Sequence, residues 1–154
     1  MIVEKNIIRM NRFQNLSTLG DGTYGTVLKA VNRSNGEVVA IKRMKRKYYS
    51  WKECIRLREI RSLKKLNHPN IIKLKEVIRE QNVLYFVFEF MEKNVYEMMK
   101  EQQQSKHRGF DEPTIMSIMF QCLTALGAST NKKKFAFLLS EFLLETNLEK
   151  NFVI

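Results

Sequence analysis

The feature that most constrains the fold is the glycine-rich stretch "LGDGTYGTV" at residues 19–27, with G-x-G-x-x-G spacing and a following valine. Glycine-rich loops of this kind hold nucleotide phosphates in several unrelated folds. In a Rossmann unit the loop opens a helix. Here "TVLKAV", then Asn35-Gly36, then "EVVAIKRM" is the pattern of two strands joined by a two-residue turn. No Gly-Lys-Ser/Thr follows the glycines, so a Walker A loop is excluded as well. The loop is therefore predicted to join strand to strand.

A helix with readable ends follows the second of these strands. Ser50 and Glu53 fit the S-x-x-E capping box, in which each side chain satisfies a free backbone donor of the other residue. Pro69 blocks continuation, so the helix is predicted to end near Asn67. Apolar or small residues recur on one predicted face, at Ile55, Ser62, Leu63 and Leu66.

Glu59 falls on the same predicted face, four residues after Ile55 and three before Ser62. A carboxylate that points inward requires a cationic partner, because an unpaired buried charge is costly. The spacing therefore predicts an inward glutamate with a basic partner. A solvated or capping role for Glu59 is the alternative.

The rest of the chain continues the alternation of strands and helices. "NIIKLKEVIRE" and "NVLYFVFEFM" read as two further strands joined by a polar turn. "NVYEMMKEQQQS" and "PTIMSIMFQCLTALG" read as helices, the second starting at Pro113 and stopping at Gly127. The tail is predicted to form an amphipathic helix from the spacing of Phe135, Leu138, Leu139, Phe142 and Leu143.

Composition limits the function classes. The net charge of +11 arises wholly between Lys42 and Lys75, where 13 Lys and Arg face two acids. A solvated basic helix face is preferred over a nucleic-acid surface, since no nucleic-acid motif accompanies the charge.

Two cysteines, Cys54 and Cys122, form no disulfide framework, and two isolated histidines make a zinc site improbable. His68 is read as a structural residue in the turn after the helix. Without a signal peptide or a long apolar run, an intracellular, soluble protein is expected.

The set of motifs carries more information than the loop alone. A glycine-rich loop between strands, Lys42 in "VAIK", an inward glutamate and an apolar strand ending in "FEFM" resemble the N-terminal lobe of a eukaryotic protein kinase. "LGDGTYGTVLKA", "VAIKRMKRKYYSWKECIRLREIRSLKKLNHPNIIKLKEVIRE" and "LYFVFEFM" are similar to the kinases related to male-germ-cell-associated kinase and intestinal-cell kinase. These are relatives of the cyclin-dependent and MAP kinases, and the resemblance covers about residues 10–126.

The resemblance implies an α+β fold, with a five-stranded, mostly antiparallel sheet and one major helix, followed by two or three helices. The implied segments are an N-terminal extension (1–9), the kinase N-terminal lobe (10–92), an incomplete C-terminal lobe (93–126) and a divergent tail (127–154).

The resemblance also implies an ATP site and its residues. Lys42 would neutralise the α- and β-phosphates, and Glu59 would hold Lys42 as an ion pair. A merely solvated lysine on an edge strand is the alternative for Lys42. Backbone N–H groups of the loop would approach the phosphates. The implied cofactor-binding set is Leu19, Gly20, Asp21, Gly22, Thr23, Tyr24, Gly25, Thr26, Val27, Ala40, Lys42, Phe88, Glu89 and Met91.

Within this set, Leu19, Val27 and Ala40 would pack on the adenine, and the backbone of Glu89 and Met91 would hydrogen-bond its edge. Phe88 would be the gatekeeper, although plain core packing is the alternative for Phe88 and Met91. Asn94 falls where ribose contacts are made. Thr23 and Tyr24 occupy positions at which relatives carry inhibitory phosphates, which would add about two negative charges each beside those of ATP.

The strings H-R-D, D-F-G and A-P-E, which hold the catalytic aspartate and the magnesium ligands of kinases, do not occur in the 154 residues. Two hypotheses follow. One is a serine/threonine kinase that uses ATP and Mg²⁺, the magnesium ligands being absent here. The other is a truncated, non-catalytic module that binds nucleotide or a protein partner. A nucleic-acid binder ranks below both, no membrane association is expected, and cytoplasm, nucleus and cilium all suit the resemblance.

Overall fold

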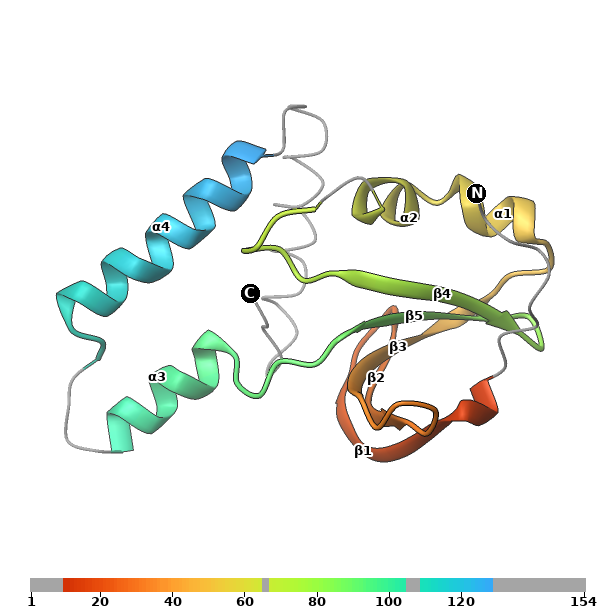
Figure 1. Cartoon of the computed structure of the whole chain (residues 1–154), viewed down its shortest axis with the longest axis horizontal. Coiled ribbons are helices and arrows are strands. Elements are labelled where there is room, and N and C mark those ends of the chain that lie inside the picture. Colours follow the sequence, from red (N-terminus) through yellow and green to blue (C-terminus); the bar gives the residue numbers. More distant parts are fainter. Residues whose placement is uncertain (1–9, 65–66, 105–108, 129–154) are drawn as a thin grey trace. The chain divides into compact units, whose positions relative to one another are not determined.

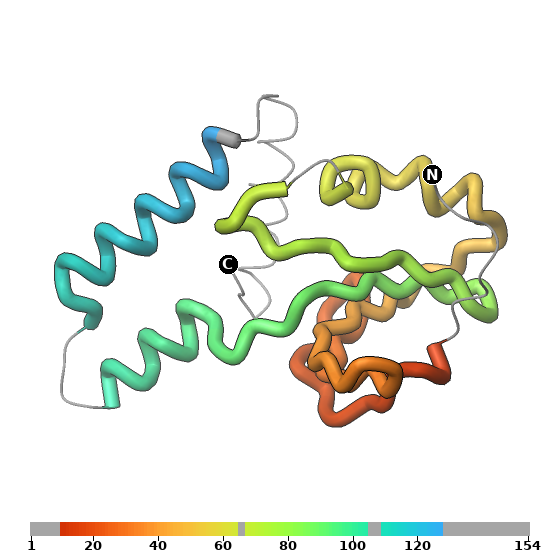
Figure 2. The backbone as a smooth tube through the Cα atoms, in the orientation of Figure 1, coloured from red at the N-terminus to blue at the C-terminus, as the bar shows by residue number. Residues whose placement is uncertain are grey.

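The computed structural model describes residues 10–64, 67–104 and 109–128. Its sheet is fully antiparallel, with the order β1-β2-β3-β5-β4 (Figure 1). This confirms the predicted five-stranded sheet, and Figure 2 follows the backbone through its hairpins. The strands are β1 (Phe13–Asp21), β2 (Gly25–Asn32), β3 (Val38–Lys47), β4 (Leu74–Glu80) and β5 (Val83–Glu89), preceded by the 3₁₀ turn η1 (Met10–Arg12).

The described residues fall into two compact units. The first holds those up to Arg61 together with Leu74–Phe90, and so contains the whole sheet. The second holds Ser62–Lys73 and the residues from Met91 onward.

The sheet has a hydrophobic cluster on each face, because successive side chains of a strand point to opposite sides. On one face the buried residues are Phe13, Ala30, Val39, Ile41, Ile78 and Val87. On the other face, Tyr48, Leu84 and Phe86 pack with Cys54 and Ile60 from the helical segment. The second cluster fixes the helical segment against the sheet.

The single helix predicted from Ser50 to Asn67 is instead two short helices, α1 (Trp51–Arg56) and α2 (Arg58–Leu63). The chain breaks at Leu57, whose ψ of 128° is not helical. In a continuous helix, positions six apart point about 120° away from each other. The break lets Cys54 and Ile60 reach the same cluster.

The apolar face predicted for this helical segment was wrong at Ile55, which is 38% exposed. Ser62 and Leu63 are half-buried, and Leu66 lies outside the described residues.

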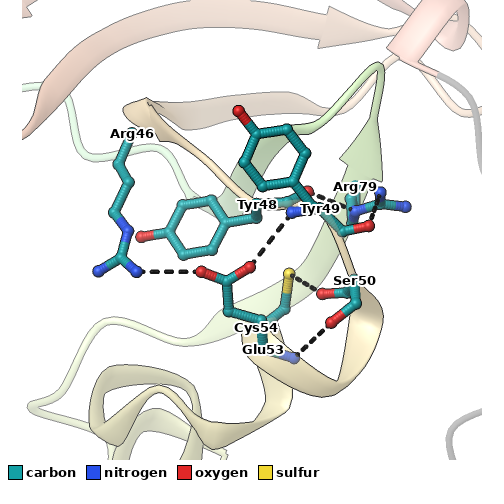
Figure 3. Close-up of polar contacts among 7 residues, drawn as sticks. All are labelled: Arg46, Tyr48, Tyr49, Ser50, Glu53, Cys54 and Arg79. Carbon is teal, nitrogen blue, oxygen red and sulfur yellow. Dashed lines mark hydrogen bonds and ion pairs between the residues drawn. The ribbon is translucent and has the colours of Figure 1, made fainter.

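A hydrogen-bonded junction joins β3 to α1 (Figure 3). Ser50 Oγ accepts the N–H of Glu53 at 3.2 Å. The Glu53 carboxylate accepts the N–H of Tyr49 and forms an ion pair with Arg46. The capping residues predicted from the sequence therefore cap α1, although Glu53 bonds Tyr49 rather than Ser50. Arg79 of β4 donates to the carbonyls of Tyr48 and Tyr49 at 2.7 and 2.6 Å.

The tight two-residue turn lies in a different hairpin from the one that the sequence predicted. The predicted two-residue turn at Asn35-Gly36 is a longer loop, because the ladder ends where Val31 pairs with Val38. Gly36 has a φ of 73°, a conformation that glycine adopts at no steric cost. The tight two-residue turn is the one between β4 and β5, with positive φ at Gln81 and Asn82.

The second unit contains the two helices predicted after the sheet, α3 (Val95–Gln104) and α4 (Glu112–Ala128). Pro113 lies in the first turn of α4, and Asp111 Oδ1 accepts the N–H of Thr114. None of the helices in the described parts of the chain is long and apolar enough to cross a membrane. The predictions for residues 1–9 and for the tail beyond Ala128 lie outside the described residues.

Candidate functional site

The centre of the site is an ion pair between Lys42 on β3 and Glu59 on α2. Lys42 Nζ lies 3.6 Å from Glu59 Oε1, and the two side chains are 15% and 17% exposed. The inward glutamate and its basic partner are therefore present as the sequence predicted. Two charges this well shielded from water interact more strongly than a surface pair.

The glycine-rich stretch is the β1–β2 hairpin, as predicted from the strand pattern on both sides of it. Gly20 and Asp21 end β1, Gly25 opens β2, and the N–H of Gly22 bonds the Gly25 carbonyl at 2.9 Å. A Cβ added at Gly25 would lie 2.4 Å from the carbonyl oxygen of Arg43 on β3. Only glycine allows the two backbones to approach this closely. Thr23 and Tyr24 at the tip are exposed.

Strand register gathers several of the predicted residues around Lys42. Lys42 pairs with Val27 on one side and with Phe86 on the other. One step along, Ala40 pairs with Phe88. Because positions i and i+2 of a strand share a face, these side chains lie on the face that carries the ion pair. Val27, Ala40 and Phe88 are each half-buried there.

The remaining predicted residues are less closely grouped. Leu19 is half-buried in β1, at an irregularity between the pairs Thr18–Leu28 and Gly20–Val27. Glu89 ends β5, paired with Val39. Met91 is 37% exposed and belongs to the second unit. Phe88 packs against the cluster that contains Phe86, with ring centroids 6.3 Å apart, so the core-packing alternative applies to it as well.

Asn94 has a local role that the sequence reading missed. It is 4% exposed, its Oδ1 accepts the N–H of Glu97 at 2.8 Å, and Glu97 Oε2 accepts the N–H of Asn94 at 3.1 Å. This is a capping box at the start of α3. The signal was the spacing N-x-x-E, which is as readable as the S-x-x-E at Ser50.

His68 accepts the N–H of Asn70 at its Nδ1, 3.1 Å away, which fits the structural role in a turn that the sequence suggested. Among the residues that the structure describes, no group of three or more His, Cys, Asp or Glu could hold a metal ion. The basic segment supplies cations to several ion pairs, Lys45–Asp21, Arg46–Glu53 and Lys75–Glu37 among them.

The sequence matches a known family over most of its length. The protein kinase domain family matches residues 13–133. The chain belongs to the protein kinase family. Serine/threonine-protein kinase MAK of Mus musculus is 57% identical over 117 residues, and serine/threonine-protein kinase ICK of Rattus norvegicus is 55% identical over the same length. The cyclin-dependent kinase F-4 of Oryza sativa subsp. japonica is 52% identical over 117 residues.

These matches confirm the resemblance to the MAK and ICK kinases and their cyclin-dependent relatives. Each covers 76% of this chain. The chain spans 18% of the length of the MAK and ICK proteins and 25% of the rice kinase.

Proposed function

We propose that the chain binds ATP on the sheet face that carries Lys42, in the manner of serine/threonine protein kinases. The observation that carries this proposal is the Lys42–Glu59 pair, 3.6 Å apart and largely shielded from solvent. A lysine held by a carboxylate beside a glycine-rich hairpin is suited to meet a triphosphate, because its cation is oriented before the ligand arrives.

The residues around the pair have the chemistry that a nucleotide requires. Backbone N–H groups between Gly20 and Gly25 would bind phosphate oxygens. Leu19, Val27 and Ala40 would contact the adenine ring, Phe88 would close the pocket behind it, and the main chain at Glu89 and Met91 would bind its polar edge. The bound nucleotide would supply the transferable phosphoryl group.

Phosphoryl transfer needs further groups that we do not find in these 154 residues. The strings H-R-D, D-F-G and A-P-E, which hold the catalytic aspartate and the magnesium ligands of kinases, are absent from the sequence. We therefore propose that a polypeptide of these 154 residues is a non-catalytic nucleotide- or partner-binding module, whereas its longer relatives are named as kinases.

A nucleotide titration tests the binding proposal. Lys42→Ala is expected to weaken the binding of a fluorescent ATP analogue about tenfold or more, because one charge-assisted contact contributes about 1.5–3 kcal/mol. Lys75→Ala is the matched control, since Lys75 is also paired with a glutamate, Glu37. Equal affinity of the wild type and Lys42→Ala would refute the site.

Incubation with radiolabelled ATP and a basic protein substrate tests the second proposal. No Lys42-dependent transfer of label is expected. Label that appears with the wild-type chain and disappears with Lys42→Ala would show that these residues are sufficient for catalysis.

A further inference from the structure

Lys45, three residues after Lys42 on β3, contacts three positions of the glycine-rich hairpin. Its Nζ donates to Asp21 Oδ2 at 3.0 Å and to the Gly22 carbonyl at 2.8 Å. Its backbone N–H donates to the Tyr24 carbonyl at 3.0 Å. One residue of β3 thus contacts both ends of the loop that joins β1 to β2.

The carboxylate of Asp21, the partner of Lys45, is also held by a second residue. Thr26 Oγ1 donates to Asp21 Oδ1 at 2.6 Å, so the two carboxylate oxygens have different donors. The hydrogen bond from Thr26, and next the one from Lys45, lower the pKa of Asp21 below its ordinary value of 3.8. Asp21 is therefore a fixed negative charge at neutral pH.

The backbone contact extends an interface that is already tight. The β2–β3 ladder ends at the pair Gly25–Met44, where the absence of a Cβ lets Gly25 lie against the Arg43 carbonyl. The bond from Lys45 to Tyr24 adds one more step to that ladder, into the loop itself. The loop is thus attached to the strand that also carries Lys42.

We infer that Lys45 is a positioning residue for the glycine-rich loop. It holds the loop against β3, and its ammonium offsets the charge of Asp21, which would otherwise repel an incoming polyanion. The second role rests on the proposed nucleotide binding. The first stands on the contacts alone.

The exposure of the Lys45–Asp21 pair to water sets the size of the effect expected when Lys45 is removed. The side chains of Lys45 and Asp21 are 50% and 57% exposed, and an exposed ion pair changes an equilibrium by at most about fivefold. This change is small compared with the free energy of global unfolding. It is large compared with the free energy of opening a surface loop, which lies at the low end of the stability range. Loss of Lys45 should therefore open the loop with little effect on the fold.

Amide hydrogen exchange of the full chain tests the holding role directly. The N–H groups of Gly22 and Lys45 are the reporters, because both are hydrogen-bonded within the loop region. Lys45→Ala is expected to speed their exchange about threefold to fivefold at an unchanged melting temperature. Lys45→Arg should restore protection, and Lys75→Ala should leave both amides as in the wild type. Unchanged exchange of both amides in Lys45→Ala would overturn the inference.

Titration with the fluorescent ATP analogue tests the electrostatic role. Lys45→Ala should weaken binding about threefold, and Asp21→Asn added to Lys45→Ala should recover most of that loss. A double variant no better than Lys45→Ala would refute the role of the Asp21 charge. If the wild-type chain binds no nucleotide, the proposed function fails, and the exchange experiment still decides whether Lys45 holds the loop.

Discussion

The ammonium of Lys42 and the carboxylate of Glu59 form an ion pair between a strand and a helix, and both side chains are largely shielded from water. The pair spans two elements that are otherwise joined by the apolar cluster around Cys54, Ile60 and Phe86. The ion pair therefore links the position of α2 to that of β3. As a result, the position of the Lys42 ammonium depends on how α2 packs against the sheet.

The Glu59→Gln variant tests how much this pair stabilises the fold. It should lower the free energy of unfolding by about 1–3 kcal/mol, because it removes the negative charge that faces the shielded ammonium of Lys42. Glu37→Gln, which removes the more exposed partner of Lys75, should cost less than about 1 kcal/mol. Urea unfolding of both variants measures the difference. Equal losses would show that shielding adds nothing to the Lys42 pair.

Gly25→Ala tests the close approach of β2 to β3. The new Cβ would meet the Arg43 carbonyl at 2.4 Å, and a backbone atom cannot move aside as a flexible side chain can. We expect a loss of about 1–3 kcal/mol, the usual cost of overpacking. Gly127→Ala in α4 is the control, since no other atom of the residues that the structure describes lies within 4 Å of its added Cβ. It should be neutral or stabilise by up to about 1 kcal/mol. A Gly25→Ala protein as stable as the wild type would show that the strands can separate freely.

Arg79→Ala tests the junction between β3 and α1 (Figure 3). Arg79 donates to the carbonyls of Tyr48 and Tyr49 and to Asn82 Oδ1. Because a bond from a charged donor contributes more than a neutral one, the variant should lose about 2–3 kcal/mol in urea unfolding. Arg46→Ala should lose less than about 1 kcal/mol, as its side chain is 68% exposed. Similar losses for the two arginines would contradict the anchoring role of Arg79.

Alkaline pH should destabilise the fold through the cluster under α1. Burial raises the pKa of the Cys54 thiol above its ordinary 9.0 and that of Tyr48 above its ordinary 10.0. The folded state therefore favours the neutral forms, and their contribution to stability is complete below pH 9.0. It is lost as the pH rises through the raised values. Urea unfolding at pH 8 and pH 10 should show the lower stability at pH 10, and a flat profile would contradict the assignment.

Thiol labelling gives a second view of the same cluster. Cys54 is fully buried, whereas Cys122 is half-buried, so an alkylating reagent at pH 8 should modify Cys122 first. Cys54 should react only as the protein unfolds. Equal labelling rates in the native protein would show that the cluster opens readily.

Patterns of short range predicted much of this structure. Alternating apolar residues gave the strands, and the spacing of Glu59 from Ile55 and Ser62 predicted its inward direction, although Ile55 itself is exposed. The break at Leu57 was not predictable in this way. The break depends on tertiary packing, because Cys54 and Ile60 both pack into the same cluster on the sheet.

The polar contacts that hold the site in place were least visible in the sequence. Lys45 lies 24 residues from Asp21, and Arg79 lies 31 residues from Tyr48. Nothing in either neighbourhood distinguishes these two residues from the other basic residues of the chain. Their partners are fixed only when strand register is known. The capping box at Asn94 is different, because its spacing was present in the sequence and could have been recognised.

Chemical labelling by an acyl-phosphate derivative of ATP tests the central proposal most directly. The amine of a lysine beside the phosphates attacks the acyl carbonyl, forms an amide and releases ATP, so the labelled residue marks the phosphate site. The account predicts acylation of Lys42, suppressed by excess ATP. Two other lysines in ion pairs are the controls, Lys75 with Glu37 and the 54% exposed Lys93 with Glu101, and both should be labelled weakly and without protection. Labelling of Lys42 that is no greater than that of Lys75 and Lys93, and is unaffected by ATP, would contradict the proposed nucleotide site.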